Sequence, residues 1–156
     1  MKARSLVATF LLLMTGAVNA AEKSVEETSG AWEILCFDDD AARYRSCYVM
    51  RGDLSVLISS QEYQLVFVGS GSDRQPGSEV TVRVDGDPPI VWREDDFYAD
   101  EAFTSAVKQF RAGKTAAFTW SRKDTGESVK GQVSLIGFTR AYRRAQEIVS
   151  EYEPEQ

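Results

Sequence analysis

Short runs in which apolar and polar residues alternate dominate the middle of the chain, with turn residues between them. In the run 80–85, three valines lie on one side of an extended strand while Thr81, Arg83 and Asp85 lie on the other. This period of two is typical of a half-buried antiparallel strand. Asp-Gly-Asp-Pro follows at 85–88 and predicts a turn. These runs constrain the chain to a mainly β fold.

The same patterns predict the remaining elements. We expect further strands at 54–59, 63–68, 89–92, 115–121 and 128–136. A helix is predicted over 101–112, because Phe103, Val107 and Phe110 recur at helical spacing and Gly113 follows the last turn. A second helix is predicted to start near Thr139. The predicted architecture is an antiparallel β-sandwich-like single domain with two packed α-helices.

The first residues have the pattern of a secretory signal peptide. Lys2 and Arg4 precede an apolar run over 6–18, which ends in Val-Asn-Ala before Ala21. A membrane-spanning helix is the alternative, but a span needs about 20 apolar residues and this run is shorter. We therefore predict a signal peptide at 1–20, a loose polar leader at 21–30 and a single domain at 31–152. The protein is predicted to be periplasmic or secreted, with association with the outer membrane as an alternative.

The charge of the chain restricts its partners. The formal net charge is −6, and removal of residues 1–20 takes away two basic residues and makes it −8. Nucleic acids and anionic membranes attract proteins in which lysine and arginine outnumber the acids. We therefore expect neither a nucleic-acid partner nor an anionic membrane surface as a partner. No later stretch looks long enough to cross a membrane, so we expect no stable membrane span after cleavage.

Cys36 and Cys47 are the only cysteines. In an oxidising compartment a lone pair in a secreted domain most often forms a disulfide, which here would join two neighbouring strands around the turn at 38–40. A redox-active pair is the alternative, but the spacing is not the close Cys-x-x-Cys that lowers a thiol pKa. We predict a structural disulfide.

The segment 133–141 predicts how the last helix is attached. It has an apolar strand end, a bend at Gly137, a core anchor at Phe138 and an N-terminal capping hydroxyl at Thr139. Phe138 begins an apolar stripe that is predicted to face the core. The other side of the helix carries charged residues that we expect to be solvated and that would suit an acidic partner: Arg140, Arg143, Arg144 and Glu147.

Taken in order, these residues resemble the invasion-associated locus B family, small exported proteins of alphaproteobacteria. The resemblance spans most of the mature chain. It is carried by Trp32 with Cys36 and Cys47, by the strand ending in Val-Asp-Gly at 84–86, by the helix-Gly-Lys step at 113–114 and, most strongly, by Ser-Leu-Ile-Gly-Phe-Thr at 134–139 followed by alanine.

The resemblance implies a mainly β envelope protein without a cofactor, linked to host-cell invasion or envelope stress rather than to a known reaction. Family members often carry a second cysteine pair after the Val-Asp-Gly strand, but the segment 91–103 has none. It contains Trp92, Phe97 and Tyr98 instead, whose packing could replace the missing disulfide. If these aromatic residues were exposed, they would form the surface for a protein partner at a host-cell surface or in the envelope.

Catalytic motifs are weak throughout. The chain has no histidine, which excludes the usual histidine-dependent triads and zinc sites. Acidic runs at 38–40, 85–87 and 94–96 could ligate calcium or serve as a glycosidase pair, although contiguous acids in turns are usually solvated. We therefore predict that the chain binds a protein partner, is not an enzyme, and has neither a metal site nor a cofactor. A small-ligand carrier and a carboxylate-dependent hydrolase are the alternatives.

Overall fold

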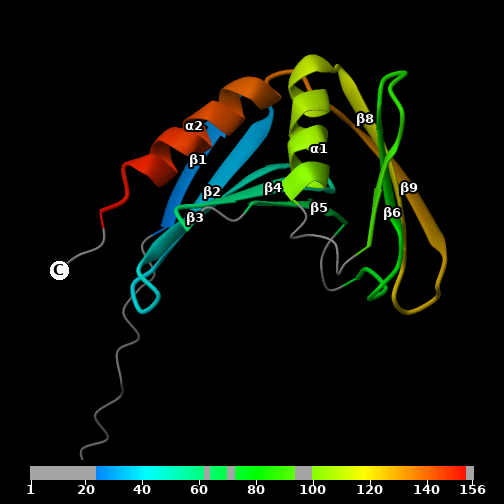
Figure 1. Ribbon diagram of the computed structural model, residues 1–156, viewed down its shortest axis with the longest axis horizontal. Helices are drawn as coiled ribbons and strands as arrows, with labels where there is room; N and C mark the ends of the chain where they lie inside the picture. Colours follow the sequence, from blue (N-terminus) through cyan, green and yellow to red (C-terminus); the bar gives the residue numbers. More distant parts are fainter. Residues whose placement is uncertain (1–23, 62–63, 70–72, 94–99, 154–156) are drawn as a thin grey trace, which may run out of the picture.

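The computed structural model describes residues 24–61, 64–69, 73–93 and 100–153. They form two antiparallel sheets and two helices, which confirms the predicted mainly β, sandwich-like domain with packed helices (Figure 1). No helix in these ranges is long and apolar enough to cross a membrane. The predicted signal peptide lies outside the described residues.

The first five strands form one sheet in simple sequence order, because only a few residues separate each strand from the next. Every neighbouring pair is antiparallel. We call this the five-stranded sheet, and its strands are β1 (Ser24–Ser29), β2 (Trp32–Asp39), β3 (Tyr44–Arg51), β4 (Leu54–Ser59) and β5 (Gln64–Val68).

The remaining strands form the four-stranded sheet, with the order β7-β6-β8-β9. Its strands are β6 (Val80–Val84), β7 (Ile90–Trp92), β8 (Thr115–Ser121) and β9 (Ser128–Ser134). Helix α1 (Asp100–Ala112) connects β7 to β8, and helix α2 (Phe138–Ser150) follows β9. The strands at 54–59 and 115–121 have the predicted bounds.

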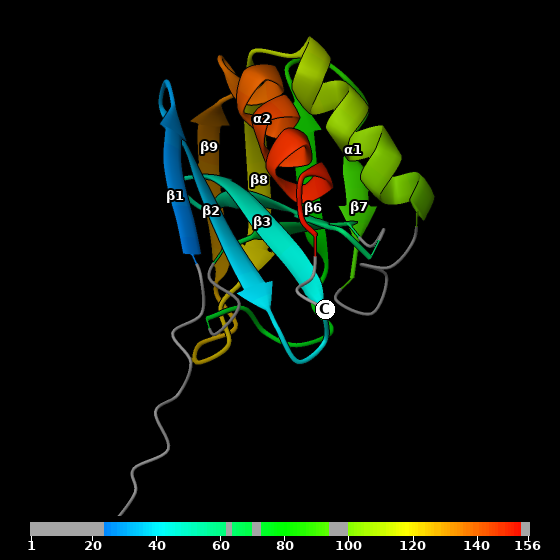
Figure 2. The ribbon, with the colours of Figure 1, turned by 90° about the vertical axis from the view of Figure 1, so that its left-hand side faces the viewer.

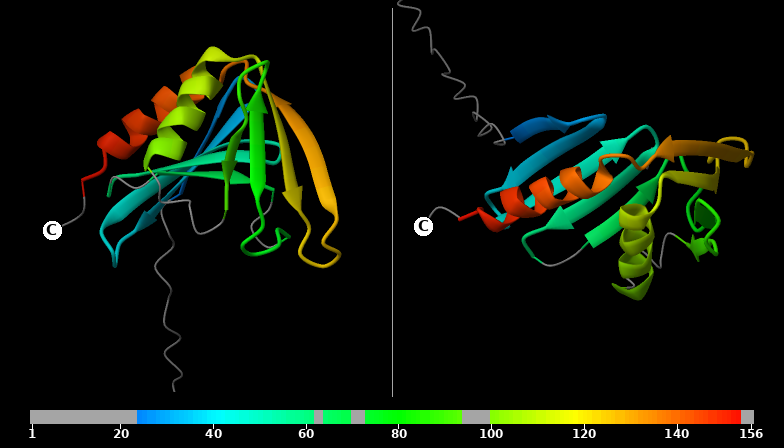
Figure 3. Two further views of the ribbon diagram at one scale, coloured as in Figure 1. Left: turned by 45° about the vertical axis from the view of Figure 1, so that its right-hand side comes forward. Right: turned by 90° about the horizontal axis from the view of Figure 1, so that it is seen from above.

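Both helices lie on the inner side of the five-stranded sheet, and α1 also contacts β7 of the four-stranded sheet. Figure 2 shows α2 in front of β2 and β3, and α1 beside β7. Seen from above in Figure 3, α2 lies over the five-stranded sheet, while α1 lies between that sheet and the four-stranded sheet. One face of each sheet is therefore covered, and each has an outer face that neither helix contacts (Figure 1).

The core is built from the inward positions of both sheets and the apolar faces of both helices. At its centre, Phe138 is fully buried between Trp32, Phe110 and Tyr142, with ring centroids 5.1 to 5.6 Å apart. Edge-on contacts of this kind add to the free energy gained from burying the rings. The predicted anchor role of Phe138 is thus confirmed by its position.

The disulfide between Cys36 and Cys47 is present, as predicted. The two cysteines are directly opposite each other in the β2–β3 register, and both are buried under α2. The bridge therefore fixes the register of these two strands at the point where the helix packs on them.

The turn between β9 and α2 differs in one detail from the expectation. Gly137 adopts a φ of 89°, a left-handed conformation that favours glycine, and the Trp32 indole donates a hydrogen bond to the Ile136 carbonyl at 3.1 Å. The prediction that the Thr139 hydroxyl caps α2 is wrong. This hydroxyl donates to the Arg111 carbonyl at 3.5 Å and so joins the start of α2 to the end of α1.

The predicted loose leader is wrong for residues 24–29, which form the edge strand β1. This segment has only one apolar residue, Val25, and its polarity suggested disorder. Its backbone nevertheless pairs with β2 over its whole length, and Glu27 forms a bidentate ion pair with Arg144 of α2, at 2.8 and 2.9 Å. The domain therefore begins at β1 rather than at residue 31.

Candidate functional site

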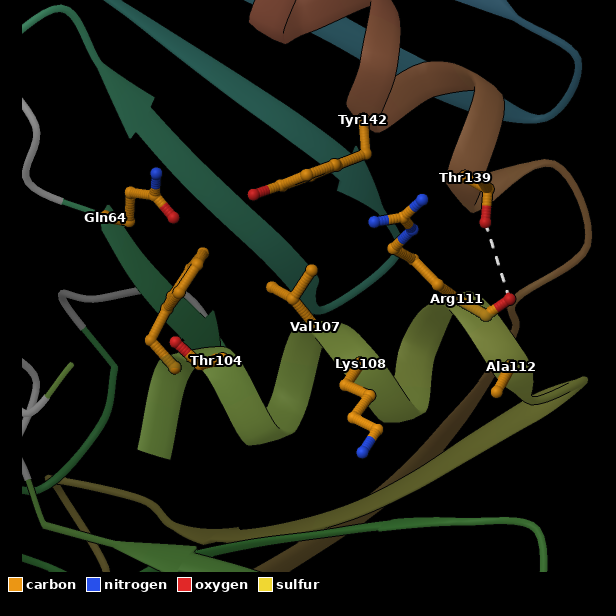
Figure 4. A pocket seen from close by; sticks show the side chains of 9 residues that line it. Gln64, Thr104, Val107, Lys108, Arg111, Ala112, Thr139 and Tyr142 are labelled. Carbon is orange, nitrogen blue, oxygen red and sulfur yellow. Dashed lines mark hydrogen bonds between the residues drawn. The ribbon is translucent and has the colours of Figure 1, made fainter. Parts of the chain in front are cut away.

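An open pocket lies where α1, α2 and the start of β5 meet (Figure 4). Its volume is about 570 Å³, which is within the range of small-molecule sites. We call it the interhelix pocket. It is lined by Gln64, Phe103, Thr104, Val107, Lys108, Arg111, Ala112, Thr139 and Tyr142.

The interhelix pocket combines an apolar wall with two cations. Val107 and Tyr142 are buried and Phe103 is half-buried, while Lys108 and Arg111 are exposed on α1. Burial raises the pKa of the Tyr142 phenol, so the hydroxyl stays protonated at neutral pH. The pocket could therefore hold an apolar molecule that carries a negative charge.

Two acids of the predicted clusters, Asp38 and Asp85, have structural partners. Asp38 is buried and accepts hydrogen bonds from the Arg45 guanidinium, which raises the pKa of Arg45. The Asp85 carboxylate accepts the backbone N–H groups of Lys114 and Thr115 at 2.9 and 3.0 Å, and so ties the end of β6 to the start of β8. Neither group is placed as an acid or base facing a cleft.

No group of three metal-ligating side chains is found among the residues that the structure describes. The acidic run at 94–96 lies outside them. Since both cysteines are in the disulfide, neither is a free nucleophile.

The predicted aromatic surface is not formed by Trp92. Its side chain is 5% exposed, because Ile90 and Trp92 of β7 both point into the core and Val91 between them points outwards. Phe97 and Tyr98 lie outside the described residues. Trp92 therefore supports the fold and cannot take part in a contact surface.

An apolar surface occurs instead on the outer face of the five-stranded sheet, away from both helices (Figure 3). A row of four residues crosses β2 to β5 in register, and three further apolar residues flank it. The row consists of Leu35, Tyr48, Leu57 and Leu65, and the flanking residues are Phe37, Met50 and Phe67. We call these seven residues the outer apolar face.

The rings of this face contact one another. Tyr48 lies between Phe37 and Phe67, with centroid distances of 6.2 Å to each. Of the seven residues only Leu57 is buried, and the others are half-buried. A hollow of about 400 Å³ beside Tyr48 and Phe67 extends to Gly52 and Gly69. Partly exposed apolar side chains gathered beside a hollow on one sheet face form a candidate contact site.

The charges around the outer apolar face have one sign. Glu26, Glu33 and Asp39 are the charged residues at the described outward positions of the five strands, and all three are acidic. The arginines of β3 point elsewhere: Arg45 contacts Asp38 on the inner side, and Arg51 donates to the Ser134 carbonyl at 2.9 Å. The face is therefore apolar with an acidic border.

Sequence reasoning missed this face, although a signal was present. In the middle of β2 and β3 the outward positions Leu35, Phe37, Tyr48 and Met50 are apolar, so the expected polar half of the alternation is interrupted there. Comparisons with known proteins add no relative: no protein-family model, no curated protein and no solved structure matches the chain. Its function must therefore be inferred from the surfaces described above.

Proposed function

We propose that the chain is an exported, non-catalytic protein that binds a protein partner through the outer apolar face. The observation that carries this proposal is a sheet face of seven apolar residues on which neither helix packs. Leaving such a surface in water costs free energy, and a partner that covers it recovers that cost. The resemblance to the invasion-associated locus B family leads to the same expectation of a binding role.

The acidic border specifies the chemistry of the partner. Glu26, Glu33 and Asp39 would repel an acidic surface and attract a basic one. Two copies of this chain that met with β1 and β2 opposite each other would bring these three acids together, so that arrangement of a second copy is disfavoured. We therefore infer a different protein, with an apolar contact surface bordered by lysine or arginine.

The experiment compares three forms of the mature protein as bait in envelope extracts and in host-cell extracts. The Tyr48→Ser/Phe67→Ser form removes two rings from the outer apolar face, and the matched Thr81→Ala/Thr119→Ala form changes the outer face of the four-stranded sheet. We expect a protein that is captured by the wild type and the control and lost with the first variant. Its purified form should bind more weakly as salt rises and with Glu33→Gln.

Two results would contradict this proposal. Equal capture by all three forms would show that the outer apolar face is not the contact site. A wild-type protein that sediments as a dimer, with the Tyr48→Ser/Phe67→Ser form a monomer, would assign the face to a second copy of the chain.

Export is part of the proposal and can be tested separately. Lys2 and Arg4, the apolar run over 6–18 and the small residues before Ala21 support secretion. The disulfide fits an oxidising compartment outside the cytoplasm. Mass spectrometry of the protein from a periplasmic or culture fraction should show an N-terminus at Ala21. A full-length protein found only in the cytoplasm would refute this step.

A small-ligand carrier is the second candidate, because the interhelix pocket has an apolar wall beside two cations. The probe is a fluorescent anilinonaphthalene sulfonate, which is apolar and anionic. If the pocket binds such ligands, Lys108→Gln should weaken probe binding and Tyr48→Ser should not. The opposite pattern would place the probe on the outer apolar face and remove the support for a carrier.

A further inference from the structure

A hollow lined by several arginines lies beside the first turns of α2, on the side away from the interhelix pocket. The end of β1, the turn at 135–137, the end of α1 and the start of α2 enclose about 750 Å³. We call this the arginine hollow. It is lined by Thr28, Ser29, Arg111, Gly113, Leu135, Ile136, Gly137, Thr139, Arg140, Arg143, Arg144 and Glu147.

Two of its four arginines have no ion pair within the described part of the chain. Arg144 is held by Glu27 and by Glu147, the latter at 3.4 Å. Arg140 and Arg143 form no ion pair with any described residue, and both are exposed. The Arg111 guanidinium points into the interhelix pocket instead (Figure 4). Two unpaired guanidinium groups beside one hollow are unexpected in a chain with a net charge of −6.

The backbone in the hollow also offers unused donors. Helix α2 has Gly137 at its N-cap, no side-chain cap and no acid in its first turn. The N–H groups of Phe138 and Ala141 donate to Leu135 and Gly137. No acceptor for the N–H groups of Thr139 and Arg140 is found among the described residues. These donors add to the positive potential that the arginines create.

We propose that the arginine hollow is a binding site for a phosphate group. Arginine presents a planar set of N–H donors that matches the oxygens of phosphate, and several such groups around one anion form charge-assisted hydrogen bonds. Glu147 is the one acid in the lining, and it shares Arg144 with Glu27.

The rim of the hollow suggests that the phosphate belongs to a larger molecule. Ile136 is 72% exposed, the most exposed large apolar side chain described, and it lies beside Gly137 at the edge of the hollow. An apolar side chain held in water next to an anion site can contact the organic part of a phosphate ester. A soluble phosphate ester and a phospholipid headgroup share this chemistry, and the experiment distinguishes them.

The first measurement titrates the mature protein with inorganic phosphate at constant ionic strength and follows the amide signals of Thr139 and Arg140 by NMR. We expect saturable shifts at these amides. Each of Arg140→Gln and Arg143→Gln should weaken binding roughly tenfold, because each loses a charge-assisted hydrogen bond. Arg83→Gln on the four-stranded sheet is the charge-matched control, and Lys108→Gln tests the interhelix pocket. Neither should change the affinity.

The second measurement uses flotation with vesicles of phosphatidylcholine, with and without phosphatidylglycerol. Binding that requires the anionic lipid, and that Arg143→Gln and Ile136→Ser both reduce, would identify a phospholipid headgroup. Phosphate binding without vesicle binding would identify a soluble phosphate ester. Amide signals that do not shift in a saturable way, or an equal loss of affinity with Arg83→Gln and Arg143→Gln, would overturn the proposal.

Discussion

The two sheets have the same kind of inner face and opposite outer faces. On the inner side of both sheets, every second residue of most strands is apolar and buried, and these residues share one core. Outwards, the four-stranded sheet presents Thr81, Arg83, Thr119, Lys130 and Gln132, which water solvates well. The five-stranded sheet presents the outer apolar face instead.

This difference shows which apolar residues the fold requires and which it does not. The inner faces must be apolar because the helices pack on them. The outer face of the four-stranded sheet follows the usual pattern of an antiparallel sheet with one side in water. The outer face of the five-stranded sheet departs from that pattern at a free-energy cost, and the departure is what points to a partner.

The largest effect is expected where the five-stranded sheet and both helices meet at one side chain. Phe138→Ala removes a fully buried ring that contacts Trp32, Phe110 and Tyr142. We expect the free energy of unfolding to fall by about 3 to 5 kcal/mol. Chemical denaturation measures it, with Ile136→Ala as the exposed neighbouring control. A loss near that of the control would show that the ring does not anchor the core.

The second effect should separate the two sheets, because the disulfide lies in only one of them. Replacing Cys36 and Cys47 together by alanine should lower stability by roughly 3 kcal/mol in the chain-entropy account. Hydrogen exchange should show more protection lost in β2 and β3 than in β8 and β9. Uniform loss across both sheets would mean that the bridge stabilises the domain as a whole.

A third effect tests how the four-stranded sheet packs without a disulfide. Gly131 is opposite Phe118, and a β-carbon there would lie 2.4 Å from the ring. Because that ring is buried, Gly131→Ala should destabilise by about 1 to 3 kcal/mol. Gly86→Ala, which meets open space, is the control in thermal unfolding. Equal melting temperatures would show that Phe118 can move aside.

These sites also show what the sequence could and could not predict. Alternation located the strands and identified the inner valines, since a period of two is a local property. It could not place Trp92, whose direction depends on β7 pairing with β6. Nor could it detect β1, because an edge strand held by backbone pairing and one ion pair needs few apolar residues. The arginine hollow depends on α1 and α2 meeting, which no local pattern contains.

A smaller change is expected on the outer apolar face. Tyr48→Ser removes ring contacts to Phe37 and Phe67, but the ring is already partly in water. The isolated protein should lose about 1 kcal/mol or less, much less than with Phe138→Ala. Thr81→Ala provides the comparison on the four-stranded sheet. A loss as large as that of a core residue would mean that Tyr48 serves the fold rather than a partner.

The smallest effect distinguishes two adjacent glutamates on opposite faces of β1. Hydrogen bonds from Arg144 lower the pKa of Glu27 from its usual value of 4.5, whereas Glu26 points outwards. A carboxyl whose pKa is lower in the folded protein stabilises it above the unfolded pKa, and this contribution disappears as the pH falls through the folded value. The ion pair is partly exposed, so only a small shift in melting temperature is expected.

Melting temperatures of the wild type, Glu27→Gln and Glu26→Gln measured from neutral to acid pH test this expectation. Glu27→Gln should melt below the wild type at neutral pH and converge with it once the carboxyl is protonated. Glu26→Gln should not show this convergence, because no arginine of the described residues contacts that side chain. If both variants behaved alike, β1 would be held by its backbone pairing to β2 alone, and its inner and outer faces would contribute equally.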